Sequence, residues 1–338
     1  MEFRYITKIL FAIIISFGII SCNEYDKFEE EMYEKNIYIV STSNFNIFDL
    51  ECDLSADNSL YHISVSASGT QKIDQDVKVT FTKDTSLLKA YNYSNFDAFE
   101  TDKFAQELPT EKYTIPSSEL TLKANNDKVY ELYPIVIETA DIFYLPPDSV
   151  YFIPLMIDKV SAYNINESKR NVLVRILPKN PFARTKETTM YALKGFKGAN
   201  TDFPIHQQIE KSNKIVQPLT SNSVKMNVGV EDTEVDKANA TTVARISMVV
   251  TIHENSTLSI APYDAAAGLL EVEMLPRPED DPDFLYANRY EAMEDPYIPE
   301  RINQRLLMYY RYRTRTTNTA NWSAWSYIRE SSSRLTFE

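Results

Sequence analysis

Apolar and polar side chains alternate with a period of two along much of the chain from Ile37 onward. The clearest example runs from Tyr61 to Ala67 and stops before Gly69. Such alternation places one face of a β-strand in a core and the other in solvent. Similar segments are Val77 to Phe81, Ile135 to Ile137, Val150 to Ile157 and Asn171 to Leu177. Because stretches rich in Asn, Asp, Ser and Pro separate them, the pattern predicts an immunoglobulin-like β-sandwich.

One segment departs from this period. Residues 87–104 carry a helical pattern, but Tyr, Asn and Ser are frequent there and lower the helix propensity. We expect a turn or two of helix at most.

A second series of strands follows the sequence Pro178 to Pro181, where we place the domain boundary. The predicted N-terminal sandwich is 37–183 and the C-terminal domain is 184–338. The second series comprises Thr188 to Leu193, Lys214 to Leu219, Val224 to Val230, Val243 to His253, Leu269 to Leu275, Arg305 to Thr317 and Trp322 to Arg329. This all-β pattern fits a second antiparallel sandwich or a small barrel, and the sequence leaves both open.

The N-terminus has the pattern of a signal peptide, residues 1–21. Basic side chains precede a run of twelve apolar residues, Ile9 to Ile20, which ends at Ser21 and Cys22. A helix needs about 20 apolar residues to span the hydrocarbon core, so a retained membrane span is not expected. The ending resembles a lipobox, which predicts lipidation of Cys22 and anchoring to a membrane. Residues 22–36 are predicted to form an acidic tether.

Charge and residue counts exclude several functions. The formal charge is −13, and removing residues 1–21, with one acidic and two basic side chains, makes it −14. Such a surface repels nucleic acid. With three histidines far apart and only Cys52 left unlipidated, we expect no metal site, no disulfide and no cofactor. The chain also lacks the GxSxG, GxxxxGK[ST] and HExxH motifs.

Several strings of the first half resemble a known domain family. They are YEKNIYIVS from Tyr33, SVSASGT from Ser64, DVKVTFTKD from Asp76, LPTEKYTIPSSELTL from Leu108, YFIPLMID and LPKNPFA. Over residues 33–183 the chain resembles the N-terminal β-sandwich of surface lipoproteins from Bacteroidetes polysaccharide-utilisation systems, which also occurs on family 18 endoglycosidases. From Met190, the strings RLLMYYRYR and ESSSRLTFE resemble the C-terminal domain of the non-catalytic members.

The resemblance implies a glycan-binding accessory rather than an enzyme, because the DxxDxDxE signature of the family 18 barrel is absent. The implied location is the outer membrane, facing the exterior. Implied partners are an oligosaccharide or polysaccharide, an importer and its glycan-capturing lipoprotein. The alternative is an adhesin or import-complex subunit that binds no sugar.

The strand Met308 to Thr316 places Tyr309, Arg311, Arg313 and Arg315 on one face. In an acidic chain this row suits an anionic sugar or a protein partner, since guanidinium binds carboxylates bidentately. The alternative is a solvated face paired with nearby Glu and Asp.

The two tryptophans, Trp322 and Trp325, are three residues apart and should point to opposite faces of one strand. One of them is then a core residue. The other either packs structurally as well or, with Tyr327 or another nearby tyrosine, forms a platform on which a sugar ring stacks.

The acidic, proline-rich segment Pro276 to Pro299 carries Tyr286, Tyr290 and Tyr297. We expect a solvated loop that contributes ligand contacts, and it lacks the spacing of an EF-hand.

Overall fold

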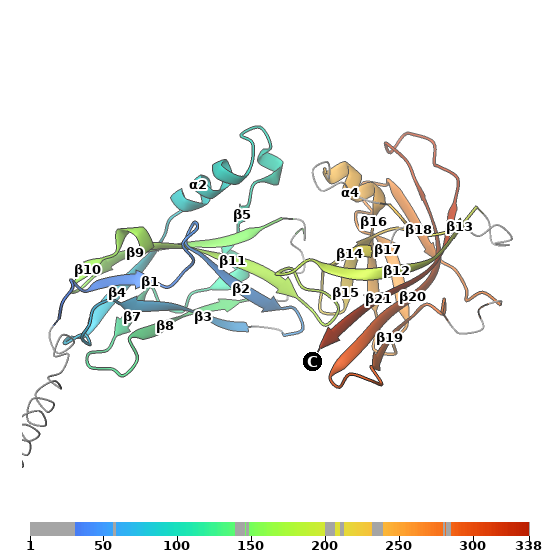
Figure 1. Ribbon diagram of the computed structural model, residues 1–338. Helices are drawn as coiled ribbons and strands as arrows, with labels where there is room; N and C mark the ends of the chain where they lie inside the picture. Colours follow the sequence, from blue (N-terminus) through green and yellow to red (C-terminus); the bar gives the residue numbers. More distant parts are fainter. Residues whose placement is uncertain are drawn as a thin grey trace, which may run out of the picture.

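The computed structural model describes residues 31–56, 59–138, 146, 149–199, 207–209, 213–231, 239–279, 281 and 285–337. These residues form two β domains that lie side by side and are joined between β11 (Asn171–Lys179) and β12 (Thr189–Gly198) (Figure 1). The predicted all-β, two-domain class is therefore confirmed. Among the described residues no helix is long and apolar enough to cross a membrane.

The first domain is a sandwich of two sheets. One sheet has the order β10 (Asn164–Ile165), β1 (Asn36–Ile39), β3 (Ser59–Ala67), β8 (Tyr130–Ile137) and β6 (Tyr113–Thr114). The other has the order β2 (Ile47–Asp53), β11, β9 (Tyr151–Val160), β4 (Val77–Lys83) and β7 (Glu119–Leu122), and β5 (Gln106–Glu107) pairs with β9. All the segments predicted as strands from the period-two pattern lie in these sheets.

The alternating apolar side chains of both sheets meet in one core. Ile63 and Ile135 from the first sheet pack with Val79 and Ile153 from the second, and each is fully buried. Cys52 also lies in this core near the end of β2, and burial raises the pKa of its thiol to about 12. The thiol is therefore protonated and acts as a small apolar side chain.

Helix α2 (Ser86–Asn95) is longer than the expected turn or two. Asp84, which precedes the N-cap residue Thr85, accepts a hydrogen bond from the Ser86 amide at 3.0 Å at the start of the helix. The buried Asn92 amide exchanges hydrogen bonds with the backbone of Ala105, at 2.9 and 2.8 Å. Tertiary contact thus overrides the poor helix propensity of this segment.

The second domain is a single, strongly curved sheet. Its order is β17 (Leu258–Pro262), β16 (Ser247–Ile252), β15 (Ser223–Asn227), β14 (Asn213–Pro218), β12, β21 (Ser326–Phe337), β20 (Arg301–Thr314) and β18 (Leu270–Met274). Two shorter strands pair beside this path, β13 (Gln207–Gln208) with β12 and β19 (Arg289–Glu294) with β20.

The two ends of this sheet approach each other. The Leu258 amide donates to the carbonyl of Asn288 at 2.9 Å, and the Tyr290 amide donates to that of Ser256 at 2.8 Å. The sheet is thus a nearly closed barrel, which decides between the two architectures that the sequence left open. Met308, Tyr310 and Val250 are fully buried in its interior.

Three expectations for the second domain were wrong. Residues 243–246, the start of the strand predicted from Val243 to His253, belong instead to helix α4 (Ala240–Ile246), whose first turn is capped by the Asn239 side chain at 2.9 Å from the Thr242 amide. The segment Pro276 to Pro299 contains strand β19 instead of being loop throughout. Trp322 and Trp325 precede β21 rather than lying on it.

Candidate ligand-binding face

Strand β20 alternates between the barrel interior and the outer surface. Leu306, Met308, Tyr310 and Tyr312 point inward and are buried. Arg311 and Arg313 point outward, as predicted, and bind acidic side chains of the neighbouring strand β18. Arg311 Nε donates to Glu273 at 2.6 Å, and Arg313 Nε donates to Glu271 at 2.5 Å. Each of these two guanidinium groups therefore has a carboxylate counter-ion.

The two indole rings lie on the same side of the sheet as the arginines, so the prediction of opposite faces was wrong. The guanidinium carbon of Arg311 is 4.3 Å from the Trp325 ring centre, and that of Arg315 is 4.4 Å from Trp322. Arg313 lies over both rings, 4.6 Å from Trp325 and 5.0 Å from Trp322. We call these five residues the arginine–tryptophan ladder.

Local backbone contacts hold the tryptophan segment against β20. The Ser323 amide donates to the carbonyl of Thr314 at 2.8 Å, and the Thr314 amide donates to Ser323 Oγ at 3.0 Å. Ser323 thus pairs with the end of β20 and sets the positions of the tryptophans on either side. Two sequence strings encode this arrangement, RYRTR at 311–315 and WSAWS at 322–326. In the first string the arginines are two residues apart on one face of a strand, which leaves room for an indole ring between them.

The ladder exposes particular groups to a ligand. Guanidinium groups cover the ring faces of both tryptophans, so a sugar meets the exposed ring edges rather than an open platform. The carboxylates beside the ladder remain accessible, since the side chains of Glu273 and Glu271 are 51% and 41% exposed. The ladder therefore offers paired hydrogen-bond acceptors and donors to a polar ligand.

We expect Arg313→Lys to lower the free energy of unfolding of the second domain by about 1–2 kcal/mol, since two cation–π contacts are weakened. Urea unfolding followed by tryptophan fluorescence measures this, because both tryptophans lie in that domain. Arg245→Lys in α4 is the matched control and should change the value by less than about 0.5 kcal/mol. Equal values for the two variants would contradict a stabilising role for the ladder.

The three predicted tyrosines lie in different places. Tyr286 contacts Arg329, whose guanidinium carbon is 5.8 Å from the ring centre. Tyr290 packs against Phe182 at 5.1 Å and against the barrel core, which makes it a structural residue. Tyr297 is 89% exposed at the turn between β19 and β20. The structure therefore brings together Trp322, Trp325, Arg311 and Arg313, but none of these three predicted tyrosines joins the ladder.

Two acidic residues of the segment Pro276 to Pro299 accept hydrogen bonds from backbone amides. Asp281 is 1% exposed and accepts hydrogen bonds from the amides of Leu285 and Tyr286 at 2.8 and 2.9 Å. Asp295 accepts from the amides of Tyr297 and Ile298 and pairs with Arg301, which holds its pKa below the usual range. Across the described part of the chain, no group of acidic, His and Cys side chains is arranged to hold a metal ion.

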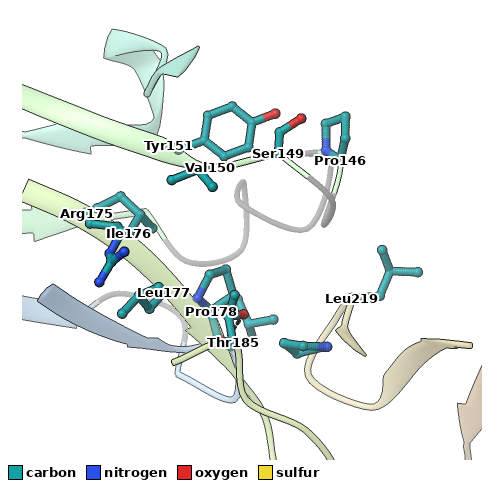
Figure 2. Close-up of a pocket in the computed structure, with 12 residues that line it drawn as sticks. Pro146, Ser149, Val150, Tyr151, Arg175, Ile176, Leu177, Pro178, Thr185 and Leu219 are labelled. Carbon is teal, nitrogen blue, oxygen red and sulfur yellow. Dashed lines mark hydrogen bonds between the residues drawn. The ribbon is translucent and has the colours of Figure 1, made fainter. Parts of the chain in front are cut away.

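A cavity of about 170 Å³ lies at the junction of the two domains (Figure 2). Leu177 and Ile176 line it from the first domain, and Pro218 and Leu219 from the second. The nearby Arg175 binds Asp49 through two hydrogen bonds at 2.7 and 2.8 Å. A mainly apolar wall whose charged group is already paired suits sugar hydroxyls less well than the ladder does.

Two further predictions concern the cysteines. Cys22 lies outside the described residues, so its lipidation stays a prediction. Cys52 is a free, buried cysteine of the first domain.

Two protein-family models match different parts of the chain. One family model, described as an N-terminal domain, matches residues 33–164, and another, described as C-terminal, matches residues 170–331. The second model begins just before β11, a strand that packs in the first domain. None of the curated proteins matches the sequence.

Solved structures with the same fold come from Bacteroides. One, of unknown function from Bacteroides ovatus, is 17% identical with a TM-score of 0.65, and the match covers 90% of this chain and 95% of that one. A multidomain protein from the same species is 16% identical, with a TM-score of 0.64 over 88% and 94%. A third, described as an auxiliary nutrient binding protein from Bacteroides thetaiotaomicron, is 14% identical, with a TM-score of 0.56 over 88% and 94%. At these identities the likeness establishes the fold.

Proposed function

The chain belongs to the two-domain family whose N-terminal and C-terminal models match it, and from this we propose a non-catalytic accessory protein that binds a nutrient glycan. The observation that carries the proposal is the ladder with its accessible carboxylates. It presents alternating donors, acceptors and indole edges on a rigid sheet, which suits the hydroxyls and CH groups of a sugar. The fold of the auxiliary nutrient binding protein supports the same role.

The arrangement of the domains supports surface display. The predicted lipid anchor at Cys22 precedes β1, which begins at the end of the first domain that lies away from the second (Figure 1). The first domain would then act as a spacer that holds the ladder away from the outer membrane. Anchoring on a surface raises the effective concentration and compensates for the modest affinity of a single sugar site. An importer that takes up the glycan is the partner we propose.

A glycan array with soluble residues 23–338 tests the role, and reproducible binding to one linkage class is the expected result.

Calorimetry with the best glycan then tests the ladder: Glu271→Gln combined with Glu273→Gln should weaken binding at least tenfold, because the acceptors lose their charge. Glu119→Gln, at an exposed site of the first domain, is the control. Silence on the array together with co-purifying membrane proteins would favour an import-complex subunit. Release of reducing sugar would indicate a hydrolase.

A further inference from the structure

A second feature of the outer barrel surface lies at the opposite end of β20 from the ladder. There a row of side chains crosses five neighbouring strands: Ile215 pairs with Met190, Leu335 pairs with Asn303, and Asn303 pairs with Met293. The four apolar members of this row, Ile215, Met190, Leu335 and Met293, are 46%, 52%, 54% and 43% exposed. Large apolar side chains gathered on one open sheet face mark a binding surface.

The middle of this row is hollowed. An open depression of about 640 Å³ has Met190, Ala192 and Leu335 as its apolar floor. Amide and hydroxyl side chains line it as well, namely Asn213, Asn303, Thr188 and Ser333. Among the described residues, the side-chain amides of Asn213 and Asn303 make no hydrogen bond with another protein group, so both face outward with unused donors and acceptors.

The chemistry of this lining selects a ligand. A side-chain amide has both a carbonyl and an NH₂ group, which match hydroxyls that donate and accept. The apolar floor suits the CH face of a sugar ring, as apolar side chains commonly do in ligand sites. The charged side chains that line it are Arg184, Glu187 and Arg334. Arg334 donates a hydrogen bond to the Phe182 carbonyl at 2.9 Å, and the other two have opposite charges, so the depression has no strong field for an anion.

We propose that this depression, which we call the sheet hollow, binds an internal segment of a neutral polysaccharide. The inference rests on the proposed glycan-binding function and adds a second contact on the same sheet. Within the described part of the chain the hollow is open and has no wall to receive a chain end, so the polymer passes across it. Two contacts on one rigid domain favour long chains over short ones, because the second contact is made within the complex.

The test measures binding by isothermal calorimetry to neutral glucan, mannan and xylan fragments of at least eight sugar units, and to polygalacturonate of the same length. The full soluble chain, residues 23–338, is compared with Asn213→Ala combined with Asn303→Ala. The control combines Asn44→Ala and Asn95→Ala, two exposed amides of the first domain, which carries neither surface. All four positions are exposed or half-buried, so the variants should fold normally.

The expected result is binding of one neutral chain, at least tenfold weaker in the hollow variant, unchanged in the control, and unaffected by reduction of the chain end. Wild-type affinity in the hollow variant, binding of polygalacturonate alone, or loss of binding on end reduction would overturn the inference and leave the proposed function standing. Binding of no fragment by the wild type would overturn both. A membrane protein that co-purifies with the wild type, and is lost with the hollow variant, would assign the surface to a protein partner instead.

Discussion

Replacing Glu330 by glutamine is expected to lower the free energy of unfolding of the second domain by about 3–5 kcal/mol. The Glu330 side chain is fully buried inside the barrel, and its two oxygens accept hydrogen bonds from Lys214 Nζ at 2.8 and 2.7 Å. Tyr310 and Ser332 each donate a further hydrogen bond at 2.7 Å. Burial raises the pKa of Tyr310 well above its usual value, so its hydroxyl keeps the proton that it donates.

The large effect follows from what the change leaves behind. Lys214 is 1% exposed, and glutamine would take away the negative charge that faces its ammonium group. A buried charge that loses its counter-ion costs far more than the net contribution of the pair. Urea unfolding followed by tryptophan fluorescence isolates the effect, because the first domain contains no tryptophan. Glu254→Gln, at an exposed site of the same domain, should change stability by less than about 0.5 kcal/mol.

A double variant separates the effect of the two charges on stability from the effect of side-chain packing. Lys214→Met combined with Glu330→Met removes both charges and keeps most of the volume, so it should recover much of the stability lost in either single variant. Two single losses that simply add in the double variant would show that the charges do not interact in the folded domain.

The first domain was largely predictable because each of its strands has one buried and one exposed face. Side chains such as Ile63 and Val65 alternate with polar neighbours, and this alternation is visible without any knowledge of the partner strand. Helix α2 was underestimated because its stability comes from distant contacts, above all those of Asn92 with Ala105.

The second domain was harder to predict because it reverses the usual rule for charged side chains. In β14, Lys214 points inward while its neighbour Ile215 is 46% exposed. Glu330 likewise lies in a run of polar residues, ESSSR, that gives no sign of burial. Neither the buried pair nor the sheet hollow can therefore be found from hydropathy, since both depend on which strands become neighbours in the barrel.

The candidate site was partly predictable. The arginine row follows from simple alternation on β20, and Arg311 and Arg313 pair with Glu273 and Glu271 of the neighbouring strand. The tryptophans were misplaced because strand geometry was assumed for Trp322 and Trp325, whereas the segment before β21 folds back over the arginines.

Gly195→Ala is expected to destabilise the second domain by about 2–6 kcal/mol, the sum of a strained backbone and an overpacked contact. Gly195 lies in β12 opposite Glu330, with a φ of +152°, a conformation that residues with a Cβ rarely adopt. A Cβ there would lie 1.9 Å from the carbonyl oxygen of Arg329. Because backbone atoms cannot rotate away as a side chain can, β12 and β21 would have to move apart where Gly195 is paired with Glu330.

Gly268→Ala is the matched control for this prediction. Gly268 also has a positive φ, +62°, but its nearest neighbour is the flexible end of Arg315 at 3.1 Å. Only the cost of placing alanine at a positive φ remains, about 1–2 kcal/mol. Urea unfolding by tryptophan fluorescence compares the two variants directly. Equal losses would mean that β12 and β21 are not held at this spacing in solution; a larger loss at Gly195 is the expected result, because the two backbones approach closely where Gly195 pairs with Glu330.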